Sequence, residues 1–210
     1  GSQCSGSVVV LDVNDFSVLC AQSYPNYDLD KYMNDPQYRE DLLLNKDGQN
    51  AMWNRCFWQG YPIGSAMKPA VALAALQEGV IDTSTQFRCG YTYYNADMPD
   101  FHPLCMGTHG YLNVIEALTV SCNIFFYDTG YNLGIDNMNL YQRKLGLGEL
   151  TGVEIYESDG TLAGPDEKED WYGGDTIMAA IGQSDNLITP VQLATYAATI
   201  ANNGTRLRTH

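Results

Sequence analysis

The residues of this chain best suited to covalent chemistry are Ser65 and Lys68, in the segment Ser65-Ala66-Met67-Lys68. Residues three apart on a helix share one face, so the lysine amine is expected within hydrogen-bond reach of the serine hydroxyl. A desolvated lysine with a depressed pKa can take the proton of that hydroxyl and make it a nucleophile. No other Ser-x-x-Lys occurs in the chain. The spacing therefore predicts an activated serine.

The sequence around this pair predicts a helix that begins near Ser65. Pro69 lacks an N–H group and is tolerated only in the first helical turn. The apolar residues over 70–76 predict a buried helix, which Gly79 can end. Ser65 would then lie at the positive end of the helix dipole, where unpaired N–H groups favour a developing oxyanion.

A second polar element, Ser121-Cys122-Asn123, is expected at a corner between two helices. A capping box at Asn113 and Glu116 predicts a short helix before it, and another helix is expected over 124–133. At such a corner the hydroxyl could relay a proton and the amide could hold a substrate amide. Serine and asparagine are also ordinary helix caps, so the tripeptide alone does not establish a catalytic role.

Together the two elements resemble the transpeptidase domain of penicillin-binding proteins, a serine family that includes β-lactamases and is marked by S-x-x-K, S-x-N and K-T-G. Other segments are similar to this family, in its order: Val8 to Asp12, Ala21 to Asp28, Asn54-Arg55, His109-Gly110, Ala117-Leu118, Phe125 to Tyr127, Gly146 to Gly148, Thr151-Gly152, Ile181 to Gln183 and Thr189 to Ala194. The similarity is greatest to the monofunctional, class B type. It implies one α/β (α+β) domain over residues 1–210, an antiparallel sheet flanked by a helical subdomain.

The resemblance implies a role for each residue of the two motifs. Ser65 would be the acylated nucleophile and Lys68 its general base, while Ser121 would shuttle the proton to the leaving amine and Asn123 would hydrogen-bond the acyl donor. The Ser65 N–H would form half of the oxyanion hole. The substrate would be the D-alanyl-D-alanine end of a peptidoglycan stem peptide, and an amine of a neighbouring stem would resolve the acyl-enzyme. β-Lactams would acylate the same serine, and no cofactor is implied.

The chain departs from the family pattern because it contains no K-T-G. Its last lysine, Lys168, is followed by Glu169-Asp170, and the chain ends at His210, soon after the helix that Thr189 begins. The expected domain is therefore truncated: its C-terminal strands and the second oxyanion N–H would be missing, and the fragment would be poorly active. Gly1-Ser2 resembles a cloning scar.

Composition limits the classes of protein to which the chain can belong. At 210 residues, with 45% hydrophobic and 17% charged residues, it can form one globular domain. A net charge of −14 argues against binding to nucleic acid or to an anionic membrane surface. No apolar run approaches the ~20 residues that span a bilayer. The resemblance implies a place at the extracytoplasmic face of the bacterial membrane, with the anchor absent from this chain, and cell-wall elongation or division proteins as partners.

The six cysteines allow several interpretations. Cys89 and Cys105 lie in a loop over 89–110 that also holds His102 and His109, and these residues could form a disulfide or a zinc site. Because neither a C-x-x-C nor a close histidine pair is present, free thiols are favoured and no metal ligand is assigned. Cys122 and Cys20 are expected to be small buried thiols.

Three other functions compete with transpeptidation. A class A β-lactamase needs a deacylating glutamate in an E-x-x-N loop, and no glutamate here has an asparagine three residues later. A D,D-carboxypeptidase uses the same acylation with water as acceptor. A non-catalytic β-lactam sensor or a scaffold for the division machinery would acylate slowly and not turn over peptide. The last two alternatives stay open.

The remaining elements follow from turn and periodicity signals. They are a hairpin of strands over 7–13 and 16–21, a polar surface connection over 25–49 with one short helix, a loop over 89–110, a helix over 136–145, an irregular stretch over 158–172 and a last helix from Thr189 to about residue 202.

Overall fold

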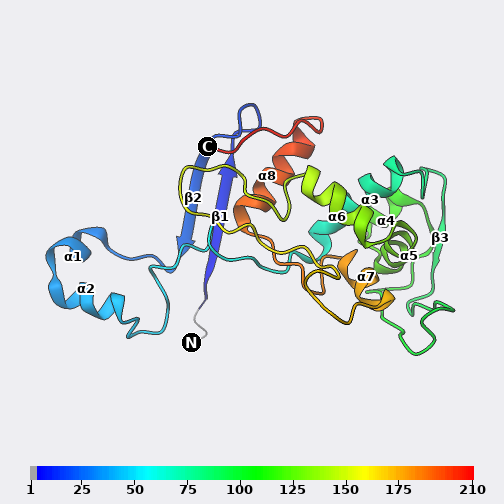
Figure 1. The fold of residues 1–210 in the computed structure, drawn as a ribbon, viewed down its shortest axis with the longest axis horizontal. Helices are drawn as coiled ribbons and strands as arrows, with labels where there is room; N and C mark the ends of the chain where they lie inside the picture. Colours follow the sequence, from blue (N-terminus) through cyan, green and yellow to red (C-terminus); the bar gives the residue numbers. More distant parts are fainter. Residues whose placement is uncertain (1–3) are drawn as a thin grey trace.

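The computed structural model describes residues 4–210, and its chain forms a hairpin lobe and a helical lobe (Figure 1). The expected cloning scar lies outside the described residues. Strand β1 (Gly6–Leu11) pairs antiparallel with β2 (Val18–Tyr24), which confirms the predicted hairpin to within a few residues. Helix α8 (Pro190–Ala201) packs against β1, between the hairpin and the helices of the other lobe.

The core of the helical lobe is built around α5 (Asn123–Leu133). This helix contacts α3 (Lys68–Gln77), α6 (Ile135–Lys144) and α7 (Gly173–Ala179). Because neighbours surround it, α5 is apolar on most of its surface, and Phe125 and Phe126 are almost fully buried. A helix that is apolar nearly all round is typical of a core position. The buried α5 helix thus holds Asn123, its first residue, in a fixed position.

Local signals in the sequence correctly predicted the helix ends nearest the two motifs. The Asn113 side chain accepts from the N–H groups of Ile115 and Glu116 and caps α4 (Val114–Thr119), as the capping box indicates. Thr189 and Gln192 form a second capping box at the start of α8. The predicted helix over 136–145 is α6, shifted by one residue.

The polar connection over 25–49 holds two short helices, so the expectation of one is wrong. They are α1 (Leu29–Asn34) and α2 (Pro36–Leu43). Asp35 separates them, because its side chain caps α2 by accepting from two backbone N–H groups. Neither helix buries a residue, and both project away from the helical lobe (Figure 1).

The loop over 89–110 is closed at its base by a short sheet that the sequence analysis did not predict. Strand β3 (Phe87–Cys89) pairs antiparallel with β4 (Gly110–Leu112), and Cys89 lies opposite Gly110. Three-residue strands carry too little alternation to stand out in a sequence. Helix α7 was also not predicted, since two glycines at its start lower its helix propensity.

The far edge of the hairpin is in contact with the C-terminal residues. The Val18 N–H donates to the His210 carbonyl at 2.7 Å, and the His210 N–H donates to the Phe16 carbonyl at 3.3 Å. The beginning of this edge, over 16–18, is therefore hydrogen-bonded to His210.

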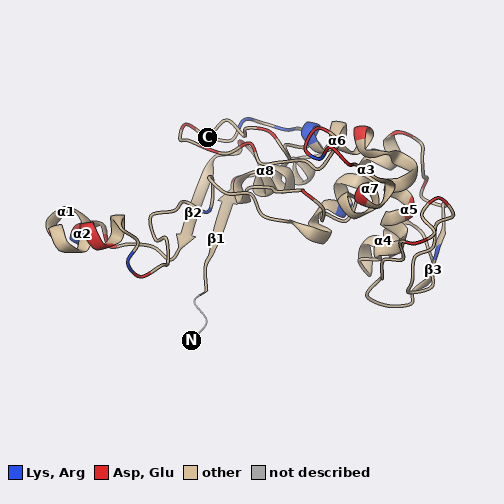
Figure 2. Cartoon of the chain, turned by 60° about the horizontal axis from the view of Figure 1, so that its bottom comes forward, with Lys and Arg blue, Asp and Glu red and all other residues tan. Residues whose placement is uncertain are grey.

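Acidic residues are spread along the chain, from α2 to the loops beside α5, and do not gather on one element (Figure 2). Within residues 4–210, no helix is both long and apolar enough to cross a membrane.

Candidate functional site

Ser65 lies in a tight 3₁₀ turn, η1 (Gly64–Met67), that leads directly into α3. The predicted helix start near Ser65 is confirmed, although the regular α-helix begins at Lys68. Pro69 occupies its first turn, where the missing N–H group costs nothing. Ser65 is exposed, whereas Lys68 is only 1% exposed. The turn therefore presents the hydroxyl outward and directs the amine into the protein.

A close backbone contact holds this turn in place. The Gly64 N–H donates to the Gly182 carbonyl at 3.0 Å. Gly182 has φ 72°, and a Cβ built on it would lie 2.1 Å from the Gly64 carbonyl oxygen. A side chain at this position would push the turn out of place, so glycine is required here for both conformation and space.

Ser121 and Asn123 lie at the junction of α4 and α5, as the sequence predicts. Ser121 follows the last turn of α4 in a left-handed conformation, with φ 53°. Asn123 is the first residue of α5. Its amide group donates to the Leu104 carbonyl at 3.3 Å, which fixes the orientation of the side chain.

These four residues form one hydrogen-bonded network. Lys68 Nζ donates to the Ser121 carbonyl at 2.8 Å, to Ser121 Oγ at 3.0 Å and to Asn123 Oδ1 at 2.7 Å. Ser121 Oγ in turn donates to Ser65 Oγ at 3.0 Å. The expected direct hydrogen bond between Lys68 and Ser65 is absent among residues 4–210. Ser121 instead joins the amine to the exposed hydroxyl.

Burial lowers the pKa of the Lys68 amine from its usual value to about 8. Removing an ammonium group from water penalises its charged form, which is the main cause of the shift. Any negative charge on Cys105 or Cys122 opposes this shift, and the amine also lies 5.7 Å from the centre of the Phe126 ring. An amine with this pKa can gain or lose a proton near neutral pH, as a general base must.

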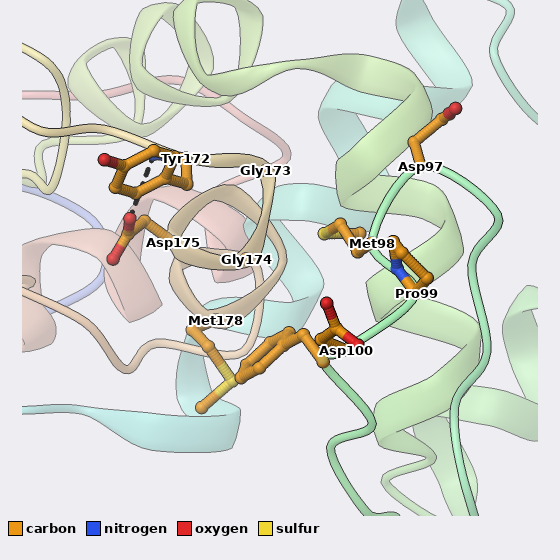
Figure 3. Close-up of a pocket in the computed structure, with 10 residues that line it drawn as sticks. Asp97, Met98, Pro99, Asp100, Tyr172, Gly173, Gly174, Asp175 and Met178 are labelled. Carbon is orange, nitrogen blue, oxygen red and sulfur yellow. Dashed lines mark hydrogen bonds between the residues drawn. The ribbon is translucent and has the colours of Figure 1, made fainter.

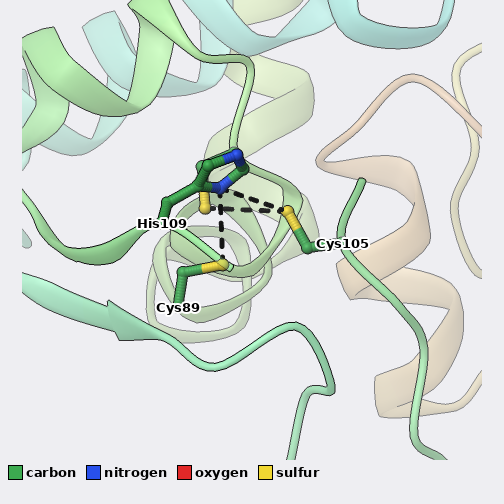
Figure 4. Close-up of side chains that lie close together, drawn as sticks. Cys89, Cys105 and His109 are labelled. Atoms are coloured by element: carbon green, nitrogen blue, oxygen red, sulfur yellow. Dashed lines mark hydrogen bonds between the residues drawn. The ribbon is translucent and has the colours of Figure 1, made fainter. Parts of the chain in front are cut away.

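Cys122, which stands between Ser121 and Asn123 in the sequence, belongs to a cluster of sulfur and imidazole groups, of which Figure 4 labels Cys89, Cys105 and His109. One ligand atom from each of Cys89, Cys105, His109 and Cys122 falls within 4.8 Å of the others. His109 Nδ1 lies 3.5 Å from Cys89 Sγ and 3.7 Å from Cys105 Sγ, and the Sγ atoms of Cys105 and Cys122 are 3.9 Å apart. Cys89, Cys105 and Cys122 are buried free thiols, as expected for Cys122, whereas Cys20 is exposed and the expectation that it is buried is wrong.

Three thiolates and one imidazole are a donor set that binds zinc tetrahedrally. The geometry is therefore compatible with the zinc interpretation, which the sequence leaves open beside the free thiols that it favours. Such an ion would join β3, the loop over 89–110 and the Ser121-Cys122-Asn123 junction. The sequence analysis missed Cys122 as a donor, because β3 and β4 close the loop only in three dimensions. His102 does not join the cluster, since its ring lies against Tyr94 at 4.8 Å.

The sequence of the chain matches one known family. The family model "Penicillin binding protein transpeptidase domain" matches residues 6–210. The chain is 31% identical over 212 aligned residues to the peptidoglycan D,D-transpeptidase MrdA of Acinetobacter baumannii, with 98% of this chain and 32% of that protein covered. The chain thus spans about a third of the length of the curated relatives it matches.

Solved structures show the same fold. Pseudomonas aeruginosa PBP2 in complex with WCK 5153 aligns with a TM-score of 0.89 and 28% identity, covering 98% of this chain and 48% of that one. PBP2 of Helicobacter pylori in complex with MreC aligns with a TM-score of 0.87 and 28% identity, covering 98% of this chain and 39% of that one. The predicted fold class is therefore confirmed.

Proposed function

This chain belongs to the penicillin-binding protein transpeptidase family, and from that premise we propose that it contributes the acylating residues of a D,D-transpeptidase that cross-links peptidoglycan stem peptides. The observation that carries the proposal is the hydrogen-bonded path from Lys68 Nζ through Ser121 Oγ to Ser65 Oγ. It joins a buried amine of lowered pKa to an exposed hydroxyl, which is the arrangement an activated serine needs.

Acylation begins with neutral Lys68. Ser65 Oγ attacks the carbonyl carbon between the two D-alanine residues, and its proton passes to Ser121 Oγ while the Ser121 proton passes to Lys68 Nζ. The peptide C–N bond then breaks, and the leaving D-alanine amine takes a proton back through Ser121. A Ser65 ester of the stem peptide remains, and Lys68 is neutral again.

Resolution of the ester follows the same path in reverse. The side-chain amine of a second stem attacks the ester carbonyl, loses a proton through Ser121 to Lys68, and displaces Ser65 Oγ, which is reprotonated. Asn123 is suited to hold the donor amide, because Lys68 and the Leu104 carbonyl already orient its side chain.

With water as the acceptor, the same residues would give a D,D-carboxypeptidase. A protein that stops at the ester would be a β-lactam sensor or scaffold.

The surroundings of the protein are part of the proposal. The curated relatives are named peptidoglycan D,D-transpeptidases, and one solved relative is a complex with MreC. We therefore place this domain at the extracytoplasmic face of the bacterial membrane, next to cell-wall elongation proteins. The 210-residue chain alone should acylate slowly, because it contains no Lys-Thr-Gly to supply the second oxyanion donor, whose loss costs about 10²–10³ in rate.

The test is covalent labelling of the full-length protein with fluorescent penicillin, followed by intact mass and peptide mapping. We expect one label, on Ser65, which Ser65→Ala abolishes and Ser5→Ala leaves unchanged, since Ser5 is an exposed serine near the N-terminus. Label on Ser121, or none at all, would overturn the assignment. Release of D-alanine with transfer to an added amine distinguishes transpeptidation from hydrolysis and from a non-catalytic role.

A further inference from the structure

A cavity of about 510 Å³ lies between the loop that joins β3 to β4 and the beginning of α7 (Figure 3). Its volume is in the range of small-molecule sites. The lining contains methionine, aromatic, glycine and aspartate residues and no lysine, arginine or histidine: Asp97 to Phe101 on one side, and Tyr172 to Asp175 with Met178 on the other. A cavity with this lining is suited to a ligand that is apolar along its length and positively charged at one end.

Both walls of the cavity continue to the catalytic network. On the loop side, Leu104 follows Phe101 by three residues and accepts the hydrogen bond from the Asn123 amide. On the α7 side, Gly182 follows Met178 by four residues and bonds to Gly64, which precedes Ser65. The two segments that line the cavity therefore lead, within three or four residues, to Leu104 and Gly182, which contact Asn123 and the turn that holds Ser65.

The backbone of α7 comes close to the loop side of the cavity because two of its residues are glycines. A Cβ on Gly173 would lie 3.1 Å from Met98 Sδ, and a Cβ on Gly174 would lie 3.3 Å from the Phe101 ring. Side chains at either glycine would narrow the cavity. The space thus depends on backbone approach by α7 on one side and on thioether and aromatic groups on the other.

One of the three lining carboxylates has no partner. Asp97 accepts from the Tyr131 hydroxyl at 2.7 Å, and Asp175 pairs with Lys168 at 2.6 Å. Asp100 makes no hydrogen bond and no ion pair with any residue between 4 and 210. In Figure 3 its carboxylate lies between the two walls, whereas Asp97 is directed away from the other lining residues. Asp100 is the carboxylate that a ligand can reach.

We propose that this cavity binds an aliphatic side chain that ends in a protonated amine, with Asp100 as the partner of that amine. The inference rests on the proposed function, because cross-linking requires a stem residue with a side-chain amine. A charge-assisted hydrogen bond to Asp100 would hold the ammonium group, and the methionines would cover the alkyl chain. The amine could belong to the donor stem or to the acceptor stem.

The test compares two probes on the full-length protein: Nα-acetyl-L-lysyl-D-alanyl-D-alanine, which has a free side-chain amine, and the same tripeptide with that amine acetylated. D-Alanine release is measured for wild type, Asp100→Asn and Asp166→Asn. Asp166 is an exposed aspartate outside the cavity, so its variant is matched in charge. Fluorescent-penicillin acylation of Ser65 is measured in parallel, since this reaction needs no amine in the cavity.

We expect wild type and Asp166→Asn to prefer the free amine by about tenfold in kcat/KM, through KM, as one charged hydrogen bond would give. Asp100→Asn should reduce this preference to about twofold or less while penicillin acylation stays within about twofold. If only the acceptor stem uses the cavity, the donor preference is absent. In that case Asp100→Asn raises the KM for Nα-acetyl-L-lysine amide added as the acceptor.

The proposal is overturned if Asp100→Asn changes neither the preference between the two donor probes nor the KM of the acceptor. A preference for the acetylated probe that Asp100→Asn leaves unchanged would also overturn it. Failure of penicillin to acylate wild-type Ser65 is a separate result. It would overturn the proposed function itself.

Discussion

Ser121-Cys122-Asn123 separates two regions that are both rich in reactive groups. On one side, Lys68 donates to Asn123 at 2.7 Å and to Ser121 at 3.0 Å, and Ser121 joins the amine to the exposed Ser65 at 3.0 Å. On the other side, Cys122 is 0% exposed and its Sγ lies 3.9 Å from Cys105 Sγ, in a cluster where His109 Nδ1 lies 3.5 Å from Cys89 Sγ. The two regions therefore share a backbone segment and differ in access and in donor chemistry.

The difference shows that a buried nucleophilic group becomes a catalytic candidate only when a path connects it to the surface. The Lys68 amine is as buried as the thiols, yet Ser121 links it to a hydroxyl that solvent reaches. Burial raises the pKa of the Cys122 thiol to about 12, and no comparable path leads outward from it among the described residues. We expect the first region to carry the reaction and the second to hold the junction in place.

Lys68→Ala should give the largest effect that separates the two regions. Loss of the general base should lower the rate of penicillin acylation by about 10²–10⁴-fold. Stopped-flow labelling of Ser65 measures the rate, and circular dichroism checks that the fold is retained. Lys144→Ala removes an exposed lysine on α6 and should leave the rate unchanged. A near-normal rate for Lys68→Ala would show that another base acts.

Ser121→Ala should have a smaller effect on the same reaction. It removes the hydroxyl between the amine and Ser65 but leaves the backbone carbonyl that Lys68 contacts. A water molecule could take the place of the hydroxyl, so we expect a loss of about 10–10²-fold in acylation. If the loss equalled that of Lys68→Ala, the relay would be indispensable. No loss would show that the proton reaches Lys68 without Ser121.

The pH dependence of acylation tests whether Lys68 acts as a base. Its pKa is lowered to about 8 by burial, and only the neutral amine can accept a proton. The rate should therefore rise about tenfold between pH 7 and pH 9 and level off above that. Lys68→Ala should abolish this rise at its low residual rate. A rate that falls with increasing pH in this range would contradict the assignment.

The cysteine and histidine cluster should show its effect in stability and only weakly in rate. We expect one zinc ion per chain by elemental analysis, and removal by a chelator should lower Tm by about 4 °C or more, because metal binding adds to the free energy of folding. Penicillin acylation should change by less than about threefold. His102→Ala serves as the control, since this histidine lies outside the cluster. Six reactive thiols without stoichiometric metal would restore the free-thiol interpretation.

The sequence predicted what short segments encode. Pro69 and the capping box at Asn113 mark helix starts, so the two motifs could be placed at the right ends of their helices. The relay through Ser121 was not predicted, because it depends on a left-handed residue and on how α3 packs against α5.

Non-local features were the hardest to predict. The donors of the cluster come together through the pairing of β3 with β4. Strands of three residues are too short for the sequence to predict this pairing. The two helices over 25–49 could have been predicted, because Asp28 and Asp35 stand at their N-caps and Pro36 follows the second cap.

The left-handed backbone of Ser121 limits how a population under antibiotic selection could change this site. Glycine and asparagine suit φ 53° but lack the hydroxyl, whereas threonine keeps the hydroxyl but is branched at Cβ and strains in this conformation. Every single replacement would lose either the backbone geometry or the relay. If β-lactams do acylate Ser65, resistance substitutions should therefore be rare at this position. They should accumulate instead at neighbouring positions with ordinary backbone conformation, where several side chains can be exchanged without strain.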